Sequence, residues 1–255
     1  MNELNDQTVD LIVTGPPYYS PLTEQKLDCG IDKTANLDEL DQEVQAYAWT
    51  LRDVFEEANR VLRDGGRMVV QTRDVRLRQV LSPVESIHRQ LIEATGLRLY
   101  TRYFGIPLHQ SLTRRRLSDS LAKQYGPLSQ DPEVFLVFIK PGPIEQNQAE
   151  LQGADSIERA LHHSSPRNNK SRHRYQAPLG VIKALIRCYS QPGDLVLDLF
   201  AGGGTTLVAA RELGRRVIGY EIDPDALALT RINLAIACQP HCQQGRASPK
   251  DLSRL

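Results

Sequence analysis

The stretch LVLDLFAGGGTT at residues 195–206, followed by VIGYEID at 217–223, decides the fold. An apolar strand runs to Asp198, three glycines let the backbone turn closely past a ligand, and Thr205 begins a helix. A second apolar strand then ends at Glu221. Strand, helix and strand in this order predict a right-handed parallel unit, and a glycine turn at a helix N-terminus favours a polar or anionic ligand.

The same alternation of strands and helices runs through most of the 255 residues. Apolar runs predict strands that begin at 9 and that cover 67–72, 97–106, 134–140, 195–199 and 217–220. Periodic apolar residues predict helices at 40–63, 82–95, 178–190, 205–213 and 224–237. We expect the sequence Asp64-Gly65-Gly66 to end the first helix and Ser82 to cap the second. The pattern indicates an α/β fold with a doubly wound sheet.

Composition excludes several classes of protein. The 31 basic residues balance 31 acidic ones, and no apolar run approaches the ~18 residues of a membrane span. The N-terminus has no basic and then apolar pattern of a secretory signal, so we expect a cytoplasmic protein. Four cysteines are too few for a disulfide scaffold. Cys238 and Cys242 flank His241, but no second pair stands at ligand spacing, so no metal is expected.

The neutral total conceals a segregation of charge along the chain. Residues 1–60 carry 13 acidic and 4 basic side chains, whereas 98–125 carry six basic side chains and one acid, and 159–174 carry five and none. Such basic stretches form either solvated faces or a surface that binds phosphate groups. Charge alone does not decide between these interpretations.

A second motif, TGPPYYS at 14–20, also follows a strand. Two prolines stiffen the turn, so a peptide carbonyl can be held outward at the carboxyl edge of the sheet beside an aromatic ring. Alone this is a stiff loop; beside a nucleoside site it could stack a flat base and accept hydrogen bonds from its amino group. The alternative interpretation of the glycine turn is a site for a nicotinamide dinucleotide. Leu207 stands at the third glycine position of the GxGxxG motif, which weakens that interpretation.

Together the two motifs resemble those of amino-methylating DNA methyltransferases that use S-adenosylmethionine. DLFAGGGTT is similar to the family's cofactor motif FxGxG, and TGPPYY is similar to its catalytic motif (D/N/S)PPY. The catalytic motif comes first, which is the permuted order of the beta class. The stretches 61–70, 132–141 and 173–194 resemble further motifs of this family, so the likeness covers nearly all of the chain except 106–132 and 141–172.

The resemblance implies a mostly parallel, Rossmann-like methyltransferase sheet of the seven-stranded type with a small inserted target-recognition region. Residues 1–140 would form a catalytic half that contains a variable basic loop at 106–132. Residues 141–172 would form the target-recognition insertion, mostly irregular with a short helix at 150–161, and 173–255 the half that binds the cofactor. Partners would be double-stranded DNA and a second copy of the chain, because an exposed apolar helix such as 40–62 would suit a homodimer.

The resemblance also assigns roles to residues. The cofactor-binding residues would be Gln176, Pro178, Asp198, Phe200, Ala201, Gly202, Gly204, Thr205, Glu221 and Ile222. The catalytic residues would be Thr14, Gly15, Pro16, Pro17 and Tyr18. The DNA-binding residues would be Arg114, Arg115, Arg116, Arg167, Lys170 and Arg172. Among these, Glu221 would hold the ribose hydroxyls, the Pro16 carbonyl would accept from the target amine, and Tyr18 would stack on the extruded base.

Several positions depart from the family pattern, among them Arg174-Tyr175 in place of Pro-Thr. Ala177 replaces the usual lysine, and Gly15 stands where the family has a side chain that accepts from the target amine. Thr14, a water or a second backbone carbonyl would have to replace that acceptor. Serine there is typical of cytosine enzymes and aspartate of adenine enzymes, so the missing carboxylate favours cytosine N4. The expected protein is thus a restriction-modification methyltransferase acting near the nucleoid, with an N6-adenine enzyme or a catalytically silent DNA-binding homologue as alternatives.

Overall fold

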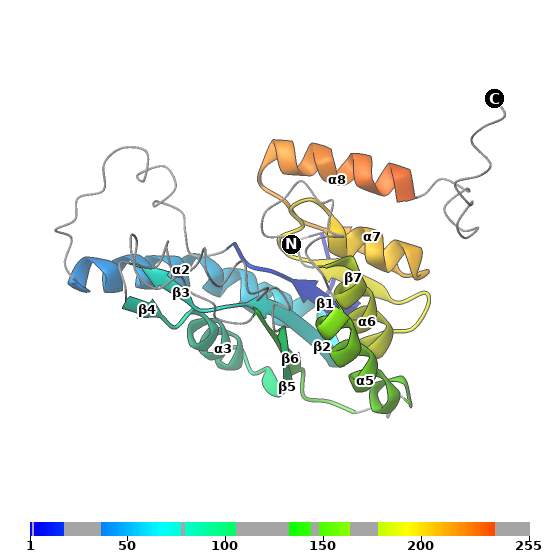
Figure 1. Ribbon diagram of the computed structural model, residues 1–255, viewed down its shortest axis with the longest axis horizontal. Helices are drawn as coiled ribbons and strands as arrows, with labels where there is room; N and C mark the ends of the chain where they lie inside the picture. Colours follow the sequence, from blue (N-terminus) through cyan, green and yellow to red (C-terminus); the bar gives the residue numbers. More distant parts are fainter. Residues whose placement is uncertain are drawn as a thin grey trace, which may run out of the picture.

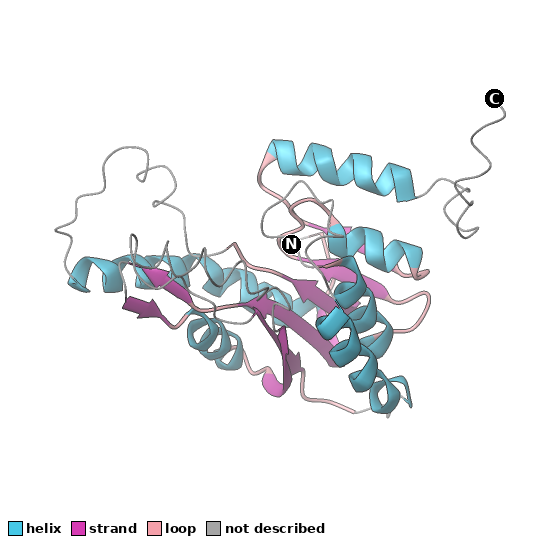
Figure 2. Ribbon diagram, viewed as in Figure 1, coloured by secondary structure: helices cyan, strands magenta, loops and turns pink. Residues whose placement is uncertain are grey.

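The computed structural model describes residues 1, 3–17, 37–77, 80–105, 133–143, 148–163 and 178–237. These residues form a six-stranded sheet with helices on both faces (Figure 1; Figure 2). The order of the strands is β5-β6-β2-β1-β7-β8. Their bounds are β1 (Val9–Thr14), β2 (Leu62–Thr72), β5 (Arg98–Gly105), β6 (Glu133–Ile139), β7 (Leu195–Asp198) and β8 (Arg216–Gly219).

The sheet is mostly parallel, as the sequence predicts. β1 pairs in parallel with both β2 and β7, and β7 pairs in parallel with β8. β6 is antiparallel to both of its neighbours, β2 and β5. The described residues contribute six strands to this sheet, so a seventh strand stays a prediction.

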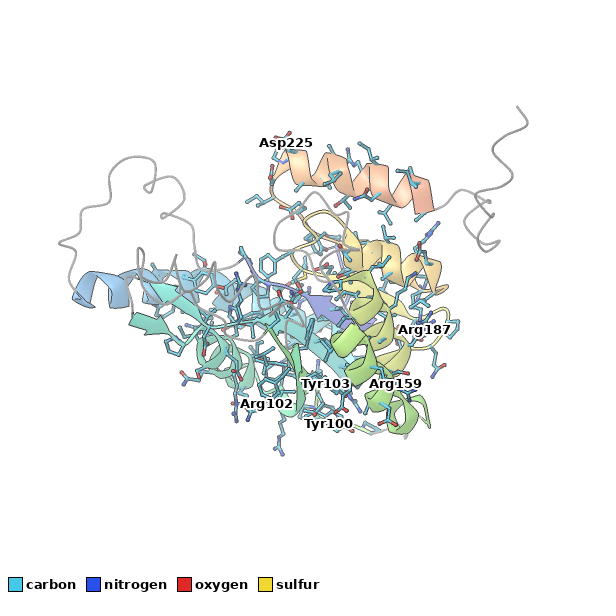
Figure 3. All side chains as sticks on the ribbon, in the orientation of Figure 1. Tyr100, Arg102, Tyr103, Arg159, Arg187 and Asp225 are labelled. Carbon is cyan, nitrogen blue, oxygen red and sulfur yellow. The ribbon has the colours of Figure 1, made fainter. Side chains whose placement is uncertain are left out.

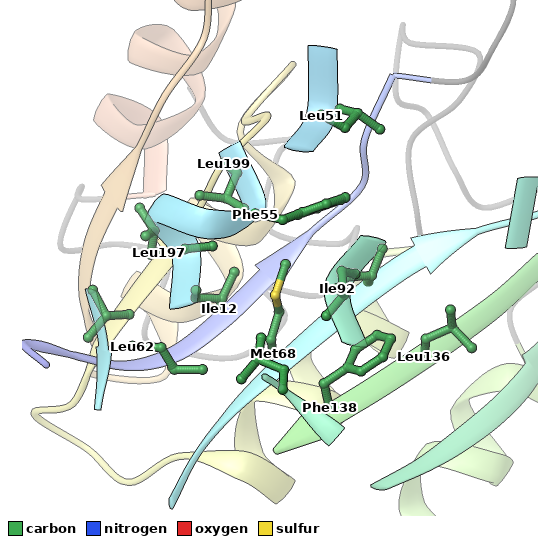
Figure 4. Close-up of a cluster of buried hydrophobic side chains, with 14 of the residues drawn as sticks. Ile12, Leu51, Phe55, Leu62, Met68, Ile92, Leu136, Phe138, Leu197 and Leu199 are labelled. Carbon is green, nitrogen blue, oxygen red and sulfur yellow. The ribbon is translucent and has the colours of Figure 1, made fainter. Parts of the chain in front are cut away.

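Helices cover each face over its own apolar cluster. α2 (Leu37–Val61) and α3 (Val84–Ala94) lie on one face, where Phe55, Met68 and Phe138 are fully buried (Figure 4). α5 (Gln148–His163), α6 (Leu179–Tyr189) and α7 (Thr205–Glu212) lie on the other face. α8 (Pro224–Ala237) packs against α7 (Figure 1). β1 faces both clusters, which explains why its sequence is an almost unbroken apolar run.

Two predicted boundaries are wrong. The sequence Asp64-Gly65-Gly66 lies inside β2, which begins directly after α2 and is extended by backbone bonds between these glycines and Lys140. Ser82 does not cap α3, because it belongs to β4 (Val80–Ser82), which forms a hairpin with β3 (Val75–Leu77). The carboxylate of Asp74 instead accepts from the Glu85 N–H in the first turn of α3, at 3.0 Å.

Residues 148–163 form a longer helix than the sequence predicts. The short helix expected at 150–161 is confirmed, but α5 has 16 residues, so this range is more helical than the mostly irregular segment expected. Its Ile157 and Leu161 are buried in the same apolar cluster as α6. A Cβ atom at Gly153 would lie 2.6 Å from the Cys188 sulfur, so a glycine is required where α5 crosses α6. The division of the chain at 140 and 172 stays a prediction.

The apolar side of α2 is buried rather than exposed. Tyr47, Leu51 and Phe55 pack against the sheet, so from Tyr47 onward this side is not available for a partner. The argument for a homodimer from an exposed helix at 40–62 therefore loses its basis. In the described part of the chain, the helices lack the combination of length and apolar character needed to cross a membrane.

The outer strand β5 presents aromatic and basic side chains to solvent (Figure 3). The guanidinium of Arg67 lies 4.9 Å from the centre of the Tyr100 ring, and that of Arg102 lies 5.3 Å from the centre of the Phe104 ring. Charged side chains at the edge of a sheet discourage pairing with a strand of another molecule.

Candidate active site

The two motifs lie side by side at one edge of the sheet. β1 and β7 are parallel neighbours, with Leu11 opposite Val196 and Ile12 opposite Leu197, so their carboxyl ends coincide. The Leu199 N–H donates to Thr14 Oγ1 at 3.2 Å and joins the start of the glycine turn to the end of β1. The chain leaves β1 toward β2 and leaves β7 toward β8, in opposite directions. Open α/β sheets bind ligands at such a point.

Side chains of α8 support the glycine turn through hydrogen bonds to its carbonyl groups. Gly202 and Gly204 both have positive φ angles, of 50° and 82°. Thr230 Oγ1 donates to the Gly202 carbonyl at 2.6 Å, and Asn233 Nδ2 donates to the Gly203 carbonyl at 2.8 Å. A Cβ atom at Gly202 would have no heavy atom within 4 Å among the described residues, so a ligand can approach the backbone there. No motif in the sequence pointed to Thr230 or Asn233.

Asp198 organises this turn from inside the protein. It is buried, and it accepts from the Phe200 N–H at 3.1 Å and from the hydroxyls of Thr14 and Thr206. Burial raises the pKa of its carboxyl to about 6, because the charged form is poorly solvated there. These contacts orient the loop, while a direct contact between Asp198 and the cofactor stays a prediction.

Glu221 reaches the glycine turn from the end of β8. Its carboxylate accepts from the Gly202 N–H at 2.7 Å and from the Asp223 N–H at 2.8 Å. Each oxygen has a second lone pair, so the carboxylate can also accept from a ligand hydroxyl. The neighbouring Ile222 side chain is 97% exposed, and the Ala201 N–H donates to the Tyr220 carbonyl at 2.8 Å.

The glycine turn contains a buried polar atom without a hydrogen-bond partner, and a ligand could supply that partner. The buried hydroxyl of Thr205, at the first residue of α7, has no hydrogen-bond partner among the described residues. A buried hydroxyl without a partner is costly, by about 1–3 kcal/mol. The open backbone at Gly202, the Glu221 carboxylate and this hydroxyl together fit a polar nucleoside-like cofactor.

A buried chain of hydrogen bonds supports the proline turn. The hydroxyl of Tyr47 lies 3.0 Å from the Pro17 carbonyl oxygen and 2.7 Å from His88 Nε2. His88 Nδ1 lies 2.8 Å from Thr72 Oγ1. Burial lowers the pKa of His88 to about 4 and raises the pKa of Tyr47, so both are neutral near pH 7.

The donor in each of these hydrogen bonds can be assigned by counting protons. A carbonyl oxygen only accepts, so the single proton of Tyr47 goes to Pro17. His88 must then donate from Nε2 to the Tyr47 oxygen and accept from Thr72 at Nδ1. The Pro17 carbonyl is therefore fixed by residues of α2, α3 and β2. Sequence reasoning missed this role, because Tyr47 and His88 look like ordinary members of amphipathic helices.

The remaining predicted residues fall in different places. Gly15 and Pro16 lie between β1 and the supported Pro17. Pro178 directly precedes α6, and its carbonyl accepts from the N–H groups of Val181 and Ile182 in the first turn. Outside the described residues lie Tyr18, Gln176, Arg114, Arg115, Arg116, Arg167, Lys170 and Arg172. The described residues contain no group of three or more His, Cys, Asp or Glu side chains that could hold a metal ion.

Comparisons with known proteins agree with this geometry. A type II methyltransferase of Methanothermobacter thermautotrophicus, M.MthZI, is 27% identical over 264 residues, which cover 88% of this chain and 70% of the relative. A Thermus thermophilus protein described as a DNA modification methylase, solved with S-adenosyl-L-methionine, has a TM-score of 0.65 at 23% identity, over 94% of this chain and 90% of that one.

The PvuII DNA methyltransferase, described as cytosine-N4-specific, has the same fold, with a TM-score of 0.61 at 17% identity over 91% of this chain and 81% of that one. A family profile described as DNA methylase matches residues 9–231, which include both turns. The chain therefore belongs to the DNA methylase family of N6 and N4 amino-methyltransferases, whose methyl donor is S-adenosylmethionine.

Proposed function

We propose that this chain is a site-specific, beta-class DNA methyltransferase that methylates the exocyclic N4 amine of cytosine in duplex DNA, as a partner of a restriction endonuclease. One observation carries the proposal. The glycine turn and the proline turn leave adjacent parallel strands and are joined by the bond between Leu199 and Thr14. A ligand held by one turn thus lies next to a ligand held by the other.

The glycine turn would hold the cofactor. The Glu221 carboxylate would accept from the ribose hydroxyls, the Gly202 backbone would pass close to the ligand, and the Thr205 hydroxyl would gain a polar partner. S-adenosylmethionine, when bound, supplies a methyl group on a positively charged sulfur that passes to the nitrogen nucleophile.

The proline turn would position the target amine. The lone pair of an exocyclic amine is delocalised into the ring, so acceptors placed on its two hydrogens favour the more nucleophilic, pyramidal nitrogen. The Pro16 carbonyl would be one acceptor, and Tyr18 would stack on the base after extrusion from the duplex. The bond from Tyr47 to the next carbonyl, that of Pro17, keeps the backbone of this turn from rotating.

The absence of a carboxylate at Gly15 favours cytosine over adenine. The experiment is to express the chain in a host that lacks N4 and N6 DNA methylation and to analyse its DNA nucleosides by mass spectrometry. We expect N4-methylcytosine, and single-molecule sequencing of the same DNA gives the recognition site. N6-methyladenine alone would replace the cytosine assignment with the adenine one. Neither base, together with no cofactor binding by calorimetry but good binding to DNA, would support a silent DNA-binding homologue.

A further inference from the structure

We propose that Gln71 supplies the side-chain acceptor for the target amine that Gly15 lacks; the inference rests on the proposed function. Gln71 is the next-to-last residue of β2, and its side chain faces the position that a side chain at residue 15 would occupy. A Cβ atom at Gly15 would lie 3.7 Å from Gln71 Oε1 and 3.8 Å from Gln71 Cβ. Apart from Gly15 itself and its two chain neighbours, the three nearest atoms to that position among the described residues all belong to Gln71.

Strand register explains this proximity. β1 and β2 are parallel, with Val13 opposite Val69 and Thr14 opposite Val70, so Gly15 and Gln71 are the next positions along the two strands. Val13 and Val69 belong to the cluster beneath α6 and α7. Because strand residues alternate between faces, Gly15 and Gln71 lie on that same face, two residues further toward the ligand edge.

Gln71 also has suitable chemistry and access. Its amide oxygen has two lone pairs and carries no charge, so it can accept from an N–H of the amine. The side chain is only half-buried, whereas the adjacent Thr72 is buried and bonds to His88 on the other face. Two consecutive residues of β2 would therefore act on different parts of the proline turn. Thr72 would support the Pro17 carbonyl through His88, and Gln71 would replace the side chain missing at residue 15.

The first test compares two substitutions in single-turnover methylation of a duplex that contains the sequenced recognition site. Gln71→Met keeps the length of the side chain but removes the acceptor, and Gln71→Glu keeps acceptor oxygens. Losing one preorganised hydrogen-bonding group costs about 10²-fold in rate, which we expect for Gln71→Met. We expect Gln71→Glu to keep most of the rate. Gln90→Met, on the exposed side of α3, is the matched control and should equal the wild type.

A second test restores the acceptor at residue 15. Gly15 does not have a positive φ angle, and its Cβ would make only ordinary contacts, so a side chain is sterically allowed. In a Gln71→Ala background, which opens the space, we expect Gly15→Asn to recover the rate at least tenfold. A double variant that folds and binds cofactor but recovers nothing would overturn the proposal.

A binding experiment detects the same contact without turnover. The probe is a duplex in which the target cytosine is replaced by 2-pyrimidinone, which has no exocyclic amine; the purine nucleoside replaces adenine if that is the target. The probe loses the bonds to both the Pro16 carbonyl and Gln71, each worth about fivefold, so the wild type should bind the normal duplex about 25-fold tighter than the probe. Gln71→Met keeps the Pro16 carbonyl and should bind the normal duplex only about fivefold tighter than the probe, and its affinity for S-adenosylmethionine should equal that of the wild type.

The outcomes separate this inference from the proposed function. A wild type that methylates neither cytosine nor adenine overturns the proposed function and the role of Gln71 with it. An active wild type whose Gln71→Met variant stays within twofold in rate, and discriminates between the duplexes as strongly as the wild type, overturns the role of Gln71 alone.

Discussion

Replacing Gly204 with alanine should destabilise the protein far more than the same change two residues earlier. Both glycines have positive φ angles, of 82° at Gly204 and 50° at Gly202. Their surroundings differ, because a Cβ atom at Gly204 would lie 3.0 Å from Thr230 Cγ2 and 3.3 Å from Thr230 Cα. At Gly202 there would be nothing within 4 Å among the described residues.

These geometries allow an estimate of how much each alanine substitution lowers the free energy of unfolding. A left-handed backbone costs an L-residue about 1–2 kcal/mol, and the less flexible unfolded chain of an alanine variant returns about 0.4–1 kcal/mol. Gly202→Ala should therefore lower the free energy of unfolding by about 0–1.6 kcal/mol. Gly204→Ala adds overpacking against Thr230, so its total should be about 1–4.6 kcal/mol, which is about 1–3 kcal/mol more than for Gly202→Ala.

Urea unfolding followed by circular dichroism measures both values, with m-values checked for equality. A Thr230→Ser change removes the methyl group that lies closest to the new Cβ and keeps the hydroxyl that donates to the Gly202 carbonyl. The Gly204→Ala, Thr230→Ser double variant should thus recover about 1 kcal/mol relative to the sum of the single changes. Equal destabilisation by Gly202→Ala and Gly204→Ala, or strict additivity of the double variant, would refute the reasoning.

Three other outcomes follow from the site and the core. The pKa of His88 is about 4 when folded and about 6.5 when unfolded, so the unfolded state takes up the proton first and stability falls as the pH drops through this window. Between pH 7 and pH 5 the wild type should lose about 2 kcal/mol more than His88→Gln, measured by urea unfolding at each pH, and equal losses would contradict the assignment. Phe55→Ala should cost about 3–5 kcal/mol because the ring is fully buried, whereas Phe104→Ala on the exposed edge should cost under about 1 kcal/mol; similar values would disprove the burial argument. Glu221→Gln should weaken S-adenosylmethionine binding about tenfold in calorimetry, with the exposed Glu56→Gln as control, and an unchanged affinity would remove Glu221 from the ribose site.

Local patterns in the sequence predicted most of the fold. The predicted strands and helices correspond to those observed over 9–14, 67–72, 195–198 and 224–237, because buried parallel strands and amphipathic helices have apolar periods that show in sequence. The errors lie where tertiary contacts override such patterns. The glycines after Asp64 look like a helix stop, yet backbone bonds to Lys140, directly after β6, keep them in a strand. α5, which packs on α6, is longer than the helix predicted at 150–161.

The sequence by itself located the two turns, since each turn is built from consecutive residues whose conformational limits are local. The chemistry of the turns stays a prediction. Only the tertiary structure decided which distant side chains serve them. Thr230 holds the Gly202 carbonyl from 28 residues away in the chain, His88 supports the proline turn through Tyr47, and Gln71 lies beside Gly15. These contacts depend on strand order, register and helix packing, which couple residues far apart in sequence and leave no mark in a local pattern.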